Sequence, residues 1–149
     1  MMFAAMMQAA DLTTKKSLNL DVARQMAAAA EAEAKANKWT VVIAIVDEGA
    51  NLIYLQRMDE TQIGSIEVAQ EKAKTAVRFK RPTKAFEDAV AGGRHVVLRL
   101  PGATPVEGGI PIMADGKVIG AIGVSGVLST QDAQIAQAGV NALAKILGW

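Results

Sequence analysis

The chain has 149 residues, of which 51% are hydrophobic and 21% charged, with a formal net charge of +1 at pH 7. This composition predicts one globular domain, and a net charge so near zero argues against nucleic acid as a partner. Cysteine is absent from the sequence, which excludes disulfides, thiolate zinc sites and a cysteine nucleophile. No apolar run is long enough to predict a membrane span.

The first 17 residues are predicted to form an extension ahead of a domain that covers residues 18–149. Residues 1–10 are apolar and carry no charged side chain. They lack the basic start of a secretory signal, although the small residues before Asp11 resemble the end of one. Two interpretations stay open: a truncated signal of a periplasmic or secreted protein, or an extension that contacts a neighbouring subunit. We expect a cytoplasmic protein.

A helix followed by a strand hairpin is predicted next. Asn19 is a typical N-cap, and apolar residues after it recur at intervals of three and four as far as about Asn37. Residues 39–46 form a β-branched run without alternation, which is typical of a strand covered on both faces. Side chains in residues 52–58 alternate more clearly than those of the first run, and the residues between the two segments are typical of a turn. Together they predict a hairpin.

Two further helices and a third strand are predicted in the middle of the chain. The second helix begins at Ser65 and ends before Pro82, because proline disfavours helical geometry in the preceding residue. Thr83 is expected to cap a third helix over residues 84–91. The apolar residues of segment 94–100 predict a strand.

A glycine-rich stretch, residues 108–126, predicts two strands joined at Asp115-Gly116, a pair that supplies the positive φ angles of a tight hairpin turn. Glycine weakens a strand unless another backbone or a ligand comes close, so we expect the second strand to be central and tightly packed. A last helix begins at Ser129, with Asp132 where a capping box usually has Glu or Gln. Together the elements predict an α+β fold with a largely antiparallel sheet and helices packed on it.

Three groups of residues carry a resemblance to a known family. They are Gly108-Gly-Ile-Pro-Ile112 with Val118-Ile-Gly-Ala-Ile-Gly-Val-Ser-Gly126, Glu71-Lys-Ala-Lys-Thr-Ala76 with Arg81-Pro-Thr83, and Ser129-Thr-Gln-Asp132. From about Leu18 to Leu147 the chain resembles the GlcG/HbpS-like haem-binding proteins, which include the C-terminal domain of PduO proteins. The resemblance implies a profilin-like fold, a five-stranded antiparallel sheet flanked by helices. It also implies homo-oligomers, often rings or double layers, and a role in binding, sensing, storing or degrading haem.

His95 is the only histidine and the expected axial ligand of a haem iron, because a neutral imidazole binds haem iron well. The alternative interpretation is a histidine at a strand start that bonds a carbonyl or faces solvent. Some relatives use a histidine in the first helix, and this helix has none. Met26, Met58, Met113 and Tyr54 are alternative ligands, although methionine at such spacing more often fills the core.

A small-molecule pocket is expected where Lys72, Glu107, Gly108, Gly109, Ser125 and Gly126 come together. Lys72 borders the apolar stripe of the second helix, and its charge would suit a haem propionate or another carboxylate. The alternative is that these glycines only permit a tight contact between subunits.

We consider three functions, in decreasing order of preference. The first, implied by the resemblance, is a small homo-oligomeric haem-binding protein, acting as a carrier, sensor or accessory factor, with a link to haem degradation. The second is an enzyme or binding protein for a small carboxylated metabolite, with a pocket near Lys72 and Gly108-Gly109. The third is a ring-forming interaction protein without a ligand.

Overall fold

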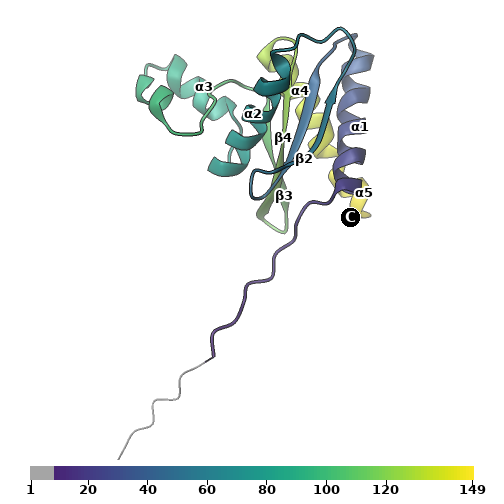
Figure 1. Ribbon diagram of the computed structural model, residues 1–149, viewed down its shortest axis with the longest axis vertical. Coiled ribbons are helices and arrows are strands. Elements are labelled where there is room, and N and C mark those ends of the chain that lie inside the picture. Colours follow the sequence, from purple (N-terminus) through teal and green to yellow (C-terminus); the bar gives the residue numbers. More distant parts are fainter. Residues whose placement is uncertain (1–8) are drawn as a thin grey trace, which may run out of the picture.

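The computed structural model describes residues 9–149 (Figure 1). The predictions made for the first eight residues lie outside this part of the chain. The strands are β1 (Val42–Asp47), β2 (Leu52–Arg57), β3 (Gly109–Ala114) and β4 (Lys117–Ser125). The helices are α1 (Leu20–Ala36), α2 (Ser65–Phe79), α3 (Lys84–Ala91), α4 (Ser129–Asn141) and α5 (Leu143–Leu147), with a short 3-10 helix, η1 (His95–Arg99).

The strands form one antiparallel sheet in the order β2-β1-β4-β3. Helix α2 covers one face of this sheet, α1 and α4 cover the other, and α5 packs against α1 and α4 (Figure 1). The α+β prediction and the antiparallel sheet are confirmed. The larger core cluster lies on the α1–α4 side, whereas smaller clusters rich in alanine and valine lie under α2.

The expected five-stranded sheet is wrong, because the sheet of residues 9–149 has four strands. The segment predicted as a third strand, residues 94–100, contains the 3-10 helix η1 instead. Its backbone hydrogen bonds join residues three apart in the chain: the Val97 amide donates to the Arg94 carbonyl, and the Leu100 amide donates to the Val97 carbonyl. An apolar run becomes a strand only where a neighbouring strand satisfies its backbone groups, and this segment has no such neighbour.

Residues 82–106, called the arm below, project from the body of the molecule (Figure 1). The arm contains α3 and η1, which pack mainly on each other. Its apolar side chains are mostly exposed, with Val96 at 65% and Leu98 at 59% of their full accessibility. Only Phe86 and Val97 are buried among its large apolar residues.

Several local predictions are confirmed. The Asn19 side chain accepts a hydrogen bond of 2.9 Å from the Val22 amide and caps α1. The β3–β4 turn has φ angles of 50° at Asp115 and 72° at Gly116, as an Asp-Gly hairpin requires. The predicted last helix is divided in two, with α4 ending at Asn141 and α5 beginning at Leu143.

Strand β4 is central and tightly packed, as the glycines predicted. A Cβ atom at Gly123 would overlap the Ala69 carbonyl and the Ala73 amide of α2. The close approach is therefore made by a helix of the same chain. Of the helices in the described part of the chain, none is long and apolar enough to cross a membrane.

Candidate functional site

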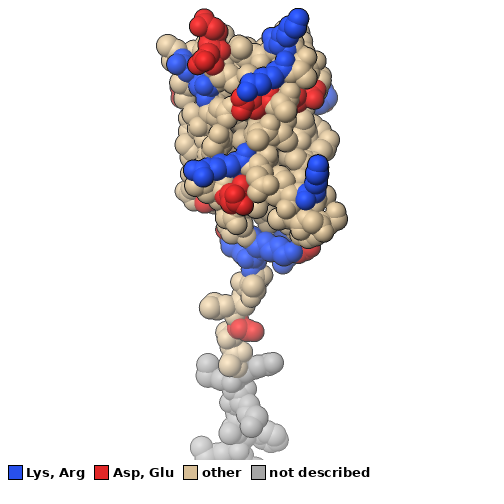
Figure 2. All heavy atoms as spheres, turned by 90° about the vertical axis from the view of Figure 1, so that its right-hand side faces the viewer, with Lys and Arg blue, Asp and Glu red and all other residues tan. Residues whose placement is uncertain are grey.

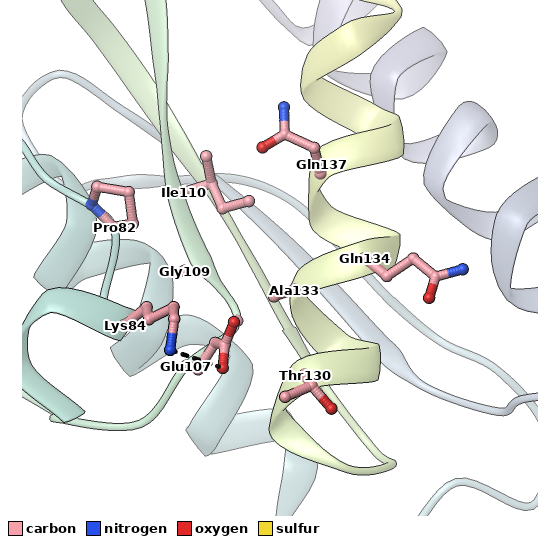
Figure 3. A pocket seen from close by; sticks show the side chains of 10 residues that line it. Pro82, Lys84, Glu107, Gly109, Ile110, Thr130, Ala133, Gln134 and Gln137 are labelled. Carbon is pink, nitrogen blue, oxygen red and sulfur yellow. Dashed lines mark ion pairs between the residues drawn. The ribbon is translucent and has the colours of Figure 1, made fainter. Parts of the chain in front are cut away.

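A groove of about 350 Å³ lies at the start of β3, where α3, the loop into β3 and helix α4 meet (Figure 3). Pro82 and Lys84 line one wall, and residues 107–110 line the base. The other wall is one face of α4, whose residues at helical spacing are Thr130, Ala133, Gln134 and Gln137. We call this hollow the groove.

Two reciprocal hydrogen bonds hold the arm to the start of β3. The Thr83 amide donates to the Gly109 carbonyl at 2.9 Å, and the Gly109 amide donates to Thr83 Oγ1 at 2.9 Å. Thr83 does occupy the N-cap position of α3, but its side chain makes no capping bond there. The prediction that the Thr83 side chain caps the helix is therefore wrong, because its hydroxyl accepts a hydrogen bond from the start of β3 instead.

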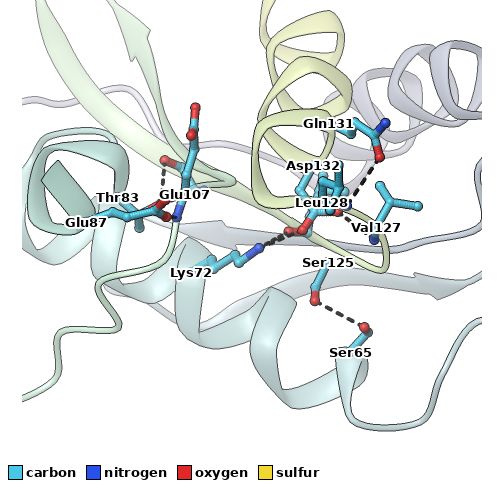
Figure 4. Close-up of polar contacts among 12 residues, drawn as sticks. Ser65, Lys72, Thr83, Glu87, Glu107, Ser125, Val127, Leu128, Gln131 and Asp132 are labelled. Atoms are coloured by element: carbon cyan, nitrogen blue, oxygen red, sulfur yellow. Dashed lines mark hydrogen bonds and ion pairs between the residues drawn. The ribbon is translucent and has the colours of Figure 1, made fainter. Parts of the chain in front are cut away.

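The charged groups of the groove are Lys84 and Glu107. Their side chains point toward one another, with Lys84 Nζ 3.9 Å from Glu107 Oε2 (Figure 3). The Glu107 side chain is 11% exposed, whereas Lys84 is more open to solvent and also pairs with Asp88 at 2.9 Å. The Glu107 amide donates to the Glu87 carboxylate, which fixes the loop against α3 (Figure 4). The groove thus offers one cation and one largely buried carboxylate side by side.

Lys72 lies behind the groove in a buried ion pair. Its Nζ donates to Asp132 Oδ2 at 2.8 Å and to the Val124 carbonyl at 3.0 Å (Figure 4). The Lys72 side chain is only 1% exposed. Gly108 makes room for this ammonium, because a Cβ there would lie 2.9 Å from Lys72 Nζ. The charge of Lys72 is neutralised by Asp132.

Asp132 is held from two directions. Burial raises the pKa of its carboxyl, and the ammonium of Lys72 opposes that rise. Its second oxygen, Oδ1, accepts from the Val127 amide at 3.2 Å.

The capping-box interpretation of Asp132 is wrong, because Gln131 supplies the oxygen that accepts from the Leu128 amide.

The other predicted site residues lie apart from the groove. Ser125 Oγ donates to Ser65 Oγ at 3.1 Å, and both side chains are buried (Figure 4). Gly126 packs against the backbone of Thr40 and Val41. His95 is exposed on the arm. The structure therefore brings Glu107, Gly108 and Gly109 together in the groove, with Lys72 directly behind them.

The groove lacks the side chains that usually ligate haem iron, which are histidine, methionine, cysteine and tyrosine. A second hollow, of about 290 Å³ beside α5, also has none in its lining. A third hollow, of about 760 Å³ at the tip of the β3–β4 hairpin, has Met113 in its lining. Within residues 9–149, no three histidine, cysteine or acidic residues gather in a group that could hold a metal ion.

Comparison with known proteins gives the family. The family model described as haem degrading protein HbpS-like matches residues 18–141. This chain belongs to the HbpS-like family. Its curated relatives include Protein GlcG of Escherichia coli (strain K12), 42% identical over 114 residues that cover 76% of this chain and 85% of GlcG.

Two solved structures of HbpS-like relatives resemble the fold closely. A double mutant of HbpS from Streptomyces reticuli superposes with a TM-score of 0.82 at 33% identity, covering 94% of this chain and 98% of that one. A structure described as a PduOC:Heme complex superposes with a TM-score of 0.77 at 30% identity, covering 85% and 95%. The recognition made from the sequence is confirmed.

In this HbpS-like chain, sequence reasoning missed the partner of Lys72. Asp132 lies on the inward face of α4 beside Ile135 and Ala136, and all three are buried. Lys72 likewise interrupts the buried stripe of α2. One cation and one carboxylate, each set in the apolar face of a helix, predict a buried pair, and that signal was present in the sequence.

Proposed function

We propose that this protein binds haem and acts as a carrier, sensor or accessory factor. The observation that carries the proposal is its match, over 85% of the chain at 30% identity, to a relative whose structure is a haem complex. The family description, a haem-degrading protein, supports a link to haem turnover. When bound, haem would supply a redox-active iron, and the chain would supply an apolar surface, cations for the propionates and a ligand for the iron.

The proposal is tested by titrating the full chain with hemin and recording the Soret band. A saturable shift with a fixed stoichiometry is expected, and no saturable shift would remove haem binding as the function. His95 as the axial ligand stays a prediction. The variant His95→Ala decides it in the same titration, because loss of the only imidazole must change the spectrum if that imidazole binds iron.

Homo-oligomerisation belongs to the same proposal, as does the profilin-like class implied by the resemblance. The apolar arm supports assembly, because exposed side chains such as Val96 and Leu98 gain from burial against a second copy of the chain. Sedimentation of the full chain measures the assembled mass, and a monomer at working concentration would contradict it. A cytoplasmic location is also retained as a prediction.

A second candidate function is binding of a small carboxylated metabolite in the groove. The groove favours it because Lys84 lies beside Glu107, so one ligand could offer a carboxylate to the first and a hydroxyl or amine donor to the second. Lys84 replaces Lys72 in this role, since Lys72 is buried in its pair with Asp132 whereas Lys84 is exposed to solvent. Thermal shift with a set of small hydroxy acids tests it: stabilisation of the wild type that is lost in Lys84→Gln is expected, and no stabilisation would contradict it.

A further inference from the structure

The Glu107 carboxylate lines the groove as a largely buried charge that lacks a hydrogen-bond donor. Its side chain is only 11% exposed, and within residues 9–149 no N–H or O–H group donates a hydrogen bond to its oxygens. Lys84 Nζ lies 3.9 Å from Oε2, which is an ion pair beyond hydrogen-bond distance. Buried polar groups normally have a hydrogen-bond partner. A carboxylate left free in a groove therefore indicates that its donor comes from a ligand.

The backbone on both sides of Glu107 holds this carboxylate in place. The Glu107 amide donates to the Glu87 carboxylate, and the carbonyl of the next residue, Gly108, accepts from the Val124 amide at 3.0 Å. Gly108 has a φ of 125°, and a Cβ there would lie 2.8 Å from the Val124 carbonyl oxygen. The loop is thus fixed before a ligand arrives, which lowers the entropic cost of binding.

The amide side chains of the groove are used elsewhere. Gln134 Nε2 donates to Glu33 at 2.6 Å, and Gln137 Nε2 donates to Asn141 at 2.7 Å. Figure 3 shows Gln134 pointing away from Glu107. The side chains that remain in the lining are that of Thr130 and the apolar ones of Pro82, Ile110 and Ala133. A ligand bound to Glu107 would therefore lie against a mainly apolar wall.

The charges around the groove favour a ligand that brings a cation. The pKa of Lys84 is raised first by the hydrogen bond with Asp88 and then by the charges of Glu107 and Glu87. One ammonium beside three carboxylates leaves this side of the groove with an excess of negative charge. The face of the molecule over α1 differs, because basic and acidic side chains are interspersed there (Figure 2).

The spacing of the two charges in the groove limits the ligand further. Lys84 Nζ and Glu107 Oε2 are 3.9 Å apart, so a ligand that contacts both must carry its own two charges close together. An α-amino acid does so, because its ammonium and its carboxylate are attached to one carbon atom. A groove of about 350 Å³ is near the lower end of the range for small-molecule sites, which suits a ligand of this size.

We propose that the groove binds a small α-amino acid with an apolar side chain, whose ammonium donates to Glu107 and whose carboxylate pairs with Lys84. This inference rests on the second candidate function above, the binding of a small carboxylated metabolite. It narrows that class from hydroxy acids to amino acids, and it makes Glu107 the residue that determines specificity.

The test is calorimetric titration of the full chain with three matched ligands: L-valine, its hydroxy analogue α-hydroxyisovalerate, and isobutylamine. L-valine should bind about tenfold more tightly than α-hydroxyisovalerate, because only its ammonium forms a hydrogen bond between two charged groups with Glu107. Isobutylamine lacks the carboxylate and should bind about two- to fivefold more weakly than L-valine, the range of an exposed ion pair with Lys84.

The variant Glu107→Gln removes the charge and keeps the size of the side chain. It should abolish the preference for L-valine over α-hydroxyisovalerate by weakening the binding of L-valine alone. The ligand-free variant should melt no earlier than the wild type, because the carboxylate accepts no hydrogen bond within residues 9–149. Glu71→Gln is the matched control: Glu71 pairs with Lys74 on α2 outside the groove, and its loss should leave both affinities unchanged.

Each contrary result has its own meaning. If α-hydroxyisovalerate binds as tightly as L-valine, or if the preference survives in Glu107→Gln, this inference is overturned while the second candidate function stands. If isobutylamine binds as tightly as L-valine, the ligand class is an amine and the amino acid assignment is wrong. If none of the three ligands binds, the second candidate function and this inference fail together, and haem binding is unaffected.

Discussion

The two ends of the β3–β4 hairpin are built in opposite ways. At its base, near Gly109 and Gly123, the backbone of α2 lies so close that a methyl group has no room, and Lys72 and Asp132 neutralise each other out of contact with water. At its tip, Met113 is open and the charged side chains are largely exposed. The difference teaches that the glycine-rich sequence marks close packing of a helix on a sheet. An open hollow of about 760 Å³ lies at the other end, where the sequence looks ordinary.

The largest effect is expected from breaking the buried pair at the base. Asp132→Leu leaves the ammonium of Lys72 buried without its counter-ion, which should lower the free energy of unfolding by about 3–5 kcal/mol. Urea denaturation of the variant measures the loss.

The double variant Lys72→Met with Asp132→Leu is the matched control for this pair. Replacing both charges by apolar groups is often neutral or stabilising, so the double variant should be more stable than the single one. A double variant less stable than Asp132→Leu would show that the pair is not the reason for the loss.

A smaller loss is expected from filling the space at Gly123. The methyl group of Gly123→Ala would press on the backbone of α2 at Ala69 and Ala73, and overpacking of this kind costs about 1–3 kcal/mol. Gly64→Ala is the control, because nothing lies within 4 Å of a Cβ there and φ is −57°. Equal melting temperatures for the two variants would contradict the close approach of α2.

The smallest effect on stability, and one of opposite sign, is expected at Lys80, which follows α2 and lines the hollow at the hairpin tip. Lys80 has φ of 53°, and glycine adopts this conformation without the steric cost that other residues bear. Lys80→Gly should therefore stabilise the fold by about 0.5 kcal/mol. Lys117→Gly, at the start of β4, removes a cation of the same hollow without relieving a positive φ and should not stabilise. Calorimetry separates the two variants.

Much of the fold could be predicted because local chemistry decides it. The Asn19 cap, the Asp115-Gly116 turn and the hydrophobic periods of α1 and α2 depend on residues close in the chain. The strand predicted at residues 94–100 failed for the opposite reason. Its run of valine and leucine suits a strand, but pairing depends on a neighbour elsewhere in the sequence, and the arm projects away from the sheet.

The candidate site was predicted only in part. Glu107, Gly108 and Gly109 do line one groove, because they are consecutive and lead into one strand. Lys72 and Asp132 are each marked by a charge in the apolar face of a helix, but they lie 60 residues apart, and only the tertiary fold brings the two helices together. Met113 was recognised as a possible ligand, but its place on an edge strand, where it is 45% exposed, is a tertiary property that the sequence does not show.

The strand order has a consequence for how the molecule folds. Strands β1 and β2 form one hairpin, β3 and β4 another, and each can close over a short stretch of chain. The seam between β1 and β4 joins segments far apart in sequence, so its closure carries most of the loop entropy. Docking of the two hairpins along that seam should therefore set the folding rate. Helix α2 contacts both β1 and β4, so its packing stabilises the two hairpins during docking.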